Sequence, residues 1–107
     1  MPEVPKHAWK QLFESLGRLH ENNIAHGDPR LSNAIFVEGK ARWIDFRSTV
    51  VHIDPGSPHL QRRDMEMLVN SCCYEGSLLS SPALKKAIED YDGTPASAVL
   101  VFEALMT

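Results

Sequence analysis

The sequence predicts an α+β fold that is mostly helical, with one helix, a polar loop, a β-hairpin and three further helices. Apolar residues recur at helical spacing near the N-terminus, two short β-prone runs flank a glycine turn, and three hydroxyl–proline pairs mark helix starts in the second half. The 107 residues are enough for one modest hydrophobic core and too few for two, so we expect a single domain.

The first helix is predicted from Pro5 to about Asn22. Its apolar residues recur at steps of three and four and therefore share one face, which holds Trp9, Leu12, Phe13, Leu16 and Leu19. Asn22 and Asn23 should end it, because asparagine tolerates the left-handed backbone conformation that helix C-termini often need.

A β-hairpin is predicted after a polar loop over residues 26–33. The runs 34–37 and 40–45 are rich in β-prone residues, and Glu38-Gly39 between them is a turn of hairpin length. Residues 47–57, which close on Pro55-Gly56, are expected to be irregular.

Three helices are predicted in the second half, at about 58–75, 82–91 and 95–106. Each begins where a hydroxyl side chain can cap the first turn and proline fits the first helical position, namely at Ser57-Pro58, Ser81-Pro82 and Thr94-Pro95. The middle helix has an apolar face made of Leu84, Ala87, Ile88 and Tyr91. The last helix is apolar on most sides, and we expect it to pack inward on the core in preference to covering a partner surface.

Composition favours a soluble cytoplasmic protein. The net charge is −3 and the basic residues are scattered, so no nucleic-acid partner is expected. No apolar run is long enough to span a membrane, and the N-terminus lacks a signal-peptide pattern. The neighbouring cysteines Cys72 and Cys73 offer no metal spacing and rarely bridge each other, so we expect buried thiols in a reducing compartment.

The polar loop and the end of the hairpin carry residues suited to phosphoryl transfer. Such chemistry needs one carboxylate to orient a hydroxyl group, and an amide oxygen with a second carboxylate to hold Mg²⁺. The loop reads His26-Gly-Asp28-Pro-Arg30-Leu-Ser-Asn33, and Asp45-Phe46 follows twelve residues later. A short loop followed by a strand pair could bring the two aspartates together.

On these motifs, the segment over residues 19–46 resembles the catalytic core of the protein kinase-like superfamily. The glycine after His26 is similar to the small-molecule and atypical branches, such as aminoglycoside- and choline-type kinases. The resemblance implies a phosphotransferase that uses ATP and Mg²⁺, with residues 1–107 as a single partial domain that corresponds to the C-terminal lobe.

The resemblance also implies a role for each residue that would take part in the reaction. Asp28 would accept a hydrogen bond from the substrate hydroxyl and take its proton. Arg30 would neutralise charge on the transferring phosphoryl group, with a structural salt bridge as the competing explanation. Asn33 and Asp45 would supply the oxygen ligands of Mg²⁺ and, through it, hold the nucleotide.

Three further residues would support the loop by this resemblance. His26 would hydrogen-bond beneath it, and Phe46 would pack beneath Asp45. Asp64 would accept backbone N–H groups of the loop, and the competing explanation is a solvated carboxylate in the first turn of a helix.

The sequence departs from the family pattern at several places, and these departures limit the activity expected of this chain. Arg47 stands where a glycine normally follows Asp-Phe, and only residues 46–63 separate Asp45 from Asp64, too few for an activation loop. No glycine-rich loop and strand lysine precede the first helix, so we expect a truncated C-lobe whose N-lobe is absent. The chain by itself should then be inactive, and it would meet a nucleotide and an unknown phosphoryl acceptor only if an N-lobe is supplied.

Two other functions remain open from the sequence. A non-catalytic interaction module derived from a kinase would use the exposed lobe face and the last helix to bind a protein partner. A metal-dependent hydrolase would instead use the two His-x-Asp steps His26/Asp28 and His52/Asp54.

Overall fold

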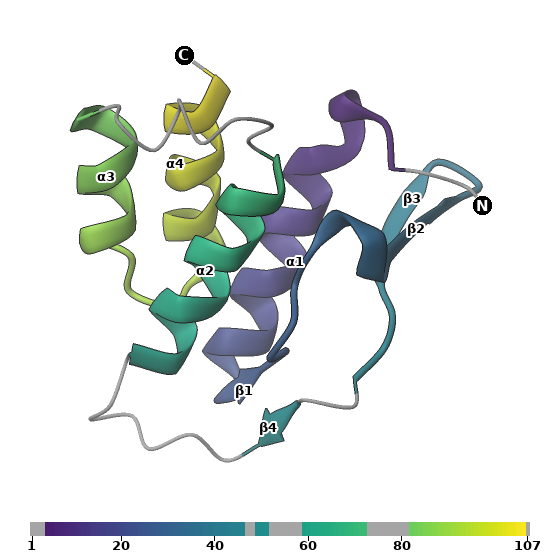
Figure 1. Ribbon diagram of the computed structural model, residues 1–107, viewed down its shortest axis with the longest axis horizontal. Helices are drawn as coiled ribbons and strands as arrows, with labels where there is room; N and C mark the ends of the chain where they lie inside the picture. The colour runs from purple at the N-terminus through teal and green to yellow at the C-terminus, as the bar shows by residue number, and fades with distance from the viewer. Residues whose placement is uncertain (1–3, 47–48, 52–58, 73–81, 107) are drawn as a thin grey trace.

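The computed structural model describes residues 4–46, 49–51, 59–72 and 82–106 (Figure 1). A 3₁₀ turn, η1 (Lys6–Ala8), leads into the helix α1 (Trp9–Glu21). The elements that follow are β1 (Ile24–Ala25), the 3₁₀ turn η2 (Leu31–Asn33), β2 (Ala34–Val37), β3 (Lys40–Trp43), β4 (Val50–Val51), α2 (His59–Cys72), α3 (Pro82–Glu89) and α4 (Pro95–Met106). The mostly helical α+β architecture predicted from the sequence is confirmed.

Helix α1 is the element around which the others pack. On the predicted apolar face, Leu12, Phe13 and Leu16 are fully enclosed, and Trp9 and Leu19 are partly buried against the core. The helix contacts α4, β3 and β1, and Figure 1 shows the hairpin near its first turn and β1 at its opposite end. It ends at the predicted asparagines, since Asn22 is its C-cap and Asn23 has a φ of 61°.

The last helix packs inward, as expected. Ala98, Val101 and Leu105 of α4 are buried, and Phe102 contacts the ring of Phe13 at 5.6 Å between ring centroids. Its N-terminus is capped as predicted, because the Thr94 hydroxyl accepts the N–H of Ser97 at 3.2 Å. The outer face is not covered by the described residues, and Leu100 there is 61% exposed.

Gly17 lets α4 approach α1 closely. A Cβ built on Gly17 would lie 2.7 Å from Pro95 Cα and 2.9 Å from the Thr94 carbonyl oxygen, both of which are backbone atoms. We therefore expect Gly17→Ala to lower the free energy of unfolding by about 1–3 kcal/mol, because the overpacking outweighs the gain in helix propensity. Urea denaturation measures the change, and Ser15→Ala on the same helix is the control. Equal or greater stability of Gly17→Ala would show that the helices do not cross this closely.

The predicted hairpin is also confirmed. Strands β2 and β3 pair antiparallel with Ala34 opposite Trp43 and Val37 opposite Lys40. The Gln11 side chain holds the hairpin on α1, because it donates to the Gly39 carbonyl at 3.2 Å and accepts the Ala41 N–H at 2.8 Å. The hairpin therefore has a fixed position on α1, and this also fixes where the segment after β3 begins.

The expectation that residues 47–57 are irregular is wrong for two of them. Val50 and Val51 form β4, which pairs antiparallel with β1 through Ala25 and Ile24. The pairing joins segments far apart in the sequence, so no local pattern reveals it. The pairing places Val50 and Val51 beside β1, next to the start of the polar loop.

The remaining predicted helices are present where the structure describes them. Helix α2 is observed over 59–72 and α3 over 82–89, within the predicted ranges. The predicted caps Ser57 and Ser81, and also Arg47, His52, Asp54 and Cys73, lie outside the described residues. The Cys72 side chain is buried, as expected. Among the described residues, no helix combines the length and the apolar character needed to cross a bilayer.

Candidate functional site

The polar loop runs from β1 to β2 and is built on an unusual backbone turn. Gly27 has a φ of 93°, a conformation that favours glycine because a Cβ would clash with the backbone. Pro29 after it is fully buried, and the loop ends in the 3₁₀ turn η2. The Leu31 N–H donates to the Ser71 hydroxyl of α2 at 2.7 Å, so the loop is fastened to α2 near its end.

His26 lies beneath the loop with both ring nitrogens occupied. Its Nδ1 accepts the backbone N–H of Asp28 at 3.1 Å, and its Nε2 therefore carries the hydrogen that is donated to the Ile44 carbonyl at 2.9 Å. The ring is fully buried, with the Trp43 and Phe46 rings at centroid distances of 5.3 and 4.9 Å. His26 thus connects the loop to the segment that follows the hairpin.

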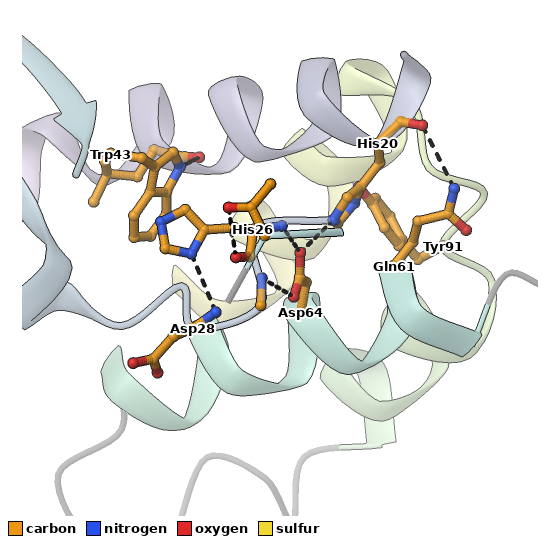
Figure 2. A network of polar contacts seen from close by, with 10 residues as sticks. His20, His26, Asp28, Trp43, Gln61, Asp64 and Tyr91 are labelled. Atoms are coloured by element: carbon orange, nitrogen blue, oxygen red, sulfur yellow. Dashed lines mark hydrogen bonds and ion pairs between the residues drawn. The ribbon is translucent and has the colours of Figure 1, made fainter. Parts of the chain in front are cut away.

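Asp64 of α2 holds the glycine turn from the other side (Figure 2). Its Oδ2 accepts the backbone N–H of His26 at 2.7 Å, and its Oδ1 accepts that of Gly27 at 3.1 Å. The residue is only 2% exposed, so the competing explanation of a solvated carboxylate is wrong. The buried charge is compensated by hydrogen bonds, which a carboxylate in the interior requires.

Asp28 projects from the loop and forms a two-bond ion pair with Arg30. The Arg30 Nε lies 2.7 Å from Oδ1 of Asp28, and Nη2 donates to Oδ2 at 3.0 Å. The two side chains are 26% and 57% exposed, for Asp28 and Arg30 respectively, so the pair is open to solvent. The salt bridge considered for Arg30 is therefore present, and it keeps a cation directly beside the Asp28 carboxylate.

The hydrogen bond from Arg30 lowers the pKa of Asp28 below its ordinary value of 3.8, with a further lowering by the Asn33 amide. Because the folded-state pKa is lowered, the pair stabilises the fold above pH 3.8, and this contribution is lost as the pH falls through the folded-state value. We expect Arg30→Gln to raise the pKa of Asp28 toward its ordinary value. An NMR titration of the Asp28 carboxyl carbon measures it, with Arg18→Gln as the control. A pKa in the unchanged protein at or above the ordinary value would contradict this assignment.

Asn33 is fixed in one orientation by Asp28. Its Nδ2 donates to the Asp28 carbonyl at 2.9 Å and to the Asp28 Oδ2 at 3.0 Å, which uses both amide hydrogens. Its Oδ1 has no hydrogen-bond partner among the described residues and remains a possible ligand for a cation. The two residues therefore act as one unit at the end of the loop.

The position of Asp45 is set by hydrogen bonds of the preceding residue, Ile44, to Asn33 and His26. The Ile44 N–H donates to the Asn33 carbonyl at 2.8 Å, and the Ile44 carbonyl accepts from His26. Asp45 has a φ of 59°, a left-handed conformation that aspartate tolerates better than most residues. Its charge acts on the pKa of Asp28, which it raises slightly against the effect of Arg30. Asp45 therefore follows a residue that is bonded to Asn33, and its charge acts on Asp28.

These residues fit a magnesium ion in their chemistry. Mg²⁺ prefers hard oxygen ligands, keeps several waters, and takes one or two carboxylates from the protein together with substrate phosphates. Within the described ranges, no three His, Cys, Asp or Glu side chains gather closely enough to hold a metal by themselves. An ion here would depend on the Asn33 amide oxygen, the Asp45 carboxylate and nonprotein oxygens.

Phe46 contacts His26 but is 49% exposed, so it covers the loop only in part. The chain after it turns back, because the Thr49 N–H donates to the Phe46 carbonyl at 3.1 Å and the Thr49 hydroxyl to the His26 carbonyl at 3.1 Å. Ile44, the residue before Asp45, is also exposed, at 36%. The exposed side chains of Ile44 and Phe46 therefore form an apolar rim on either side of Asp45.

The metal-dependent hydrolase hypothesis loses His26 as a metal ligand, the histidine of its first His-x-Asp step. His26 is buried and both of its ring nitrogens are engaged in hydrogen bonds, so it offers no lone pair to a metal ion. His52 and Asp54, the second step, lie outside the described residues.

Two buried residues that the sequence analysis did not single out belong to this network. His20 Nε2 lies 2.9 Å from Asp64 Oδ2, and His20 Nδ1 lies 2.5 Å from the Tyr91 hydroxyl (Figure 2). The sequence contained a signal for His20, because it falls four residues after Leu16 on the buried face of α1. A polar group on that face must find a partner.

Comparison with known proteins gives partial matches to kinases. A provisionally named serine/threonine-protein kinase of Acanthamoeba polyphaga mimivirus is 46% identical over 44 residues, which are 40% of this chain and 8% of that protein. The serine/threonine-protein kinase mph1 of Schizosaccharomyces pombe is 40% identical over 38 residues, 36% of this chain and 6% of mph1. The KEOPS complex subunit Bud32 of Pyrococcus abyssi is 36% identical over 61 residues, 53% of this chain and 28% of Bud32.

The chain thus spans less than a third of each of these relatives. No protein-family model matches it. No solved structure matches it either. The short similarities support a kinase-like superfamily for this chain, and the fold is compatible with a partial kinase-like domain.

Proposed function

We propose that the chain supplies the catalytic-loop half of an ATP- and Mg²⁺-dependent phosphotransferase site. The observation that carries the proposal is the unit of Asp28 and Asn33. The Asn33 amide donates both of its hydrogens to Asp28, which leaves a neutral oxygen beside a carboxylate, and the Ile44 peptide brings Asp45 to the same place. Positioning and electrostatics supply most of the catalysis in phosphoryl transfer, and this arrangement provides both.

In this proposal Asp28 orients the acceptor hydroxyl group and takes its proton late in the transfer. The low pKa of Asp28 keeps it ionised at neutral pH, so it is ready to accept a hydrogen bond from the hydroxyl. The solvent exposure of its side chain, at 26%, leaves room for a substrate. The phosphoryl acceptor is therefore a hydroxyl compound whose further identity the proposal leaves open.

Arg30 has two possible partners in such a site. It now binds both oxygens of Asp28, and its own side chain is 57% exposed. A phosphoryl group that entered beside Asp28 would offer the guanidinium a second anion with matching geometry. Arg30 then neutralises charge on that group while it keeps Asp28 in place.

Asn33 and Asp45 would hold Mg²⁺ by their side-chain oxygens, and the ion would supply positive charge to the phosphate oxygens of ATP. His26 and Asp64 act through the backbone, since His26 fixes the peptide before Asp45 and Asp64 fixes the peptides before Asp28. Phe46 packs against the buried His26 ring.

The nucleotide-clamping half of the site would come from further residues of the same protein or from another polypeptide. The 107 residues contain no glycine-rich loop followed by a strand lysine, the pattern that covers and pairs the phosphates of ATP in kinases. We therefore expect no ATP turnover above background from these residues alone. A clear rate that Asp28→Asn abolishes would overturn this half-site assignment.

Binding of Mn²⁺ without a nucleotide tests the metal assignment on the chain itself, because Mn²⁺ takes the same oxygen ligands as Mg²⁺ and broadens nearby NMR signals. We expect the amide signals of Asp28, Asn33 and Asp45 to broaden first. Asp45→Asn should greatly reduce the effect, and it preserves a side chain that tolerates the left-handed backbone.

Asp90→Asn on the surface is the matched control and should leave the broadening unchanged. The Asp90 carboxylate is 64% exposed and pairs only with Lys86 among the described residues. Broadening centred on that surface, or equal broadening in Asp45→Asn, would contradict the assignment.

A second candidate function is a non-catalytic interaction module. The exposed apolar rim of Ile44 and Phe46 beside the site favours a protein partner on this face. A partner that binds the rim with unchanged affinity when Asp45 is replaced by asparagine would favour this function over the catalytic one.

A further inference from the structure

A series of buried hydrogen bonds joins the α3–α4 connection to the polar loop. Tyr91, two residues after the end of α3, is 3% exposed, and its hydroxyl lies 2.5 Å from His20 Nδ1. His20, near the end of α1, is 1% exposed and contacts Asp64 Oδ2 with Nε2 at 2.9 Å. Asp64 in turn accepts the N–H groups of His26 and Gly27 (Figure 2).

If the His20 ring carries a single hydrogen, the groups that face its two nitrogens fix the position of that hydrogen. The ionised Asp64 carboxylate only accepts, so the hydrogen between it and His20 must lie on Nε2. In the neutral imidazole Nδ1 is then an acceptor, and the Tyr91 hydroxyl is the donor that lies within reach. Burial, with a contribution from the charge of Asp64, raises the pKa of Tyr91, so its hydroxyl keeps the hydrogen at neutral pH.

We propose that Tyr91 is a positioning residue for the loop, because it holds His20 in the neutral tautomer with hydrogen on Nε2 and thereby completes the hydrogen bonds of Asp64. The carboxylate then receives three donors, two of them from the peptides that form the glycine turn before Asp28. The meaning of this arrangement for catalysis rests on the proposed function, whereas the arrangement itself does not.

Tyr91 also connects these buried hydrogen bonds to the N-terminal cap of α4. The Asp92 carboxylate accepts the Thr94 N–H at 3.1 Å, and the Asp92 backbone N–H donates to the Ser97 hydroxyl at 3.2 Å, so Asp92 belongs to the cap of α4. Tyr91 therefore joins the α3–α4 connection to the loop over a sequence distance of more than sixty residues. A change in that connection would reach Gly27 through two side chains.

Tyr91→Phe tests the proposal, because it removes the hydroxyl and preserves the ring that contacts His20 at 5.5 Å. A buried Nδ1 without a donor then favours another tautomer, protonation or a turn of the ring, and each of these changes the contact with Asp64. In the unchanged protein, ¹⁵N NMR of His20 should show hydrogen on Nε2 and a bare, hydrogen-bonded Nδ1. In Tyr91→Phe we expect that pattern to be lost.

Amide hydrogen exchange gives the effect on the loop. Exchange at Gly27 should become about tenfold faster in Tyr91→Phe, while the amides of Leu12 and Leu16 in α1 keep their rates. A general loss of stability would instead speed all of them together. In a His20→Gln background, Tyr91→Phe should leave exchange at Gly27 unchanged, because the route through the imidazole no longer exists.

Hydrogen on Nδ1 of His20 in the unchanged protein would overturn the proposal, and this result needs no variant to fold. Equal Gly27 exchange in Tyr91→Phe and the unchanged protein would overturn it as well. None of these measurements uses a nucleotide. If they hold but Asp28→Asn leaves phosphoryl transfer intact, the proposed function fails and the role of Tyr91 in shaping the loop stands.

Discussion

Asp64→Ala is expected to lower the free energy of unfolding by about 3–5 kcal/mol, the range found when one partner of a buried charged network is removed. The substitution takes away the acceptor for His20, His26 and Gly27 at once. The two backbone N–H groups and the imidazole would then lie buried without a partner, and each such group costs free energy. Domains of this size have about 5–15 kcal/mol in total, so much of the population should unfold.

Urea denaturation followed by circular dichroism measures the loss. Glu66→Ala, two residues along the same helix and exposed, is the control and should change stability by no more than about 0.5 kcal/mol. If Asp64→Ala lost less than about 1 kcal/mol, the hydrogen bonds to Asp64 would contribute little to the fold.

Local patterns were sufficient to predict most of the fold. The buried face of α1, the Glu38-Gly39 turn and the Thr94 cap each depend on residues that are close in sequence, and each is present in the structure. The Pro95 start of α4 matches the prediction to the residue, because the cap and the proline specify the same position.

Contacts between residues far apart in the sequence could not be predicted from local patterns. The pairing of β1 with β4 involves two residues on each side, which is too short for any periodicity. The contact between Gly17 and Pro95 decides how closely two helices pack, and glycine in a helix is ambiguous until its neighbour is known.

For the candidate site, the sequence predicted which residues take part but did not predict how their side chains are oriented. His26, Asp28 and Asn33 lie within eight residues, and their type and spacing were enough to single them out. That Asp28 would be bound through both oxygens by Arg30 was one of two alternatives, since spacing alone does not set side-chain orientation.

His20 and Tyr91 are the residues that sequence reasoning missed. They meet across 71 positions of the chain, and the apolar pattern assigns Tyr91 only to the apolar face of the predicted helix over 82–91. Its hydroxyl becomes significant only when the ring is seen to lie against a buried histidine. The buried position of His20 predicted a partner but could not predict which one.

Asp28→Asn is expected to lower the rate of phosphoryl transfer by about 10²–10⁴-fold, the usual contribution of a general base. An asparagine at this position can still accept from Asn33 and from Arg30 Nη2 through its Oδ1, although its amide nitrogen loses the contact with Arg30 Nε. The bond from Asn33 to the backbone carbonyl and the bonds of Asp64 to the glycine turn do not depend on this side chain, so the loop should keep its shape. It cannot take a proton from the acceptor hydroxyl. The loss should therefore appear in kcat, with little change in the KM for ATP.

The rate of ADP formation by Asp28→Asn, compared with the unchanged sequence, tests most directly whether this loop transfers phosphoryl groups. The sample contains the chain together with the nucleotide-binding residues that the proposal requires, on the same polypeptide or added in trans. Asp90→Asn, the same chemical change at an exposed position, should keep the full rate. A drop of about 10²-fold or more in Asp28→Asn alone is the predicted result. A rate within about threefold of the unchanged protein would contradict the assignment of Asp28 and with it the proposed function.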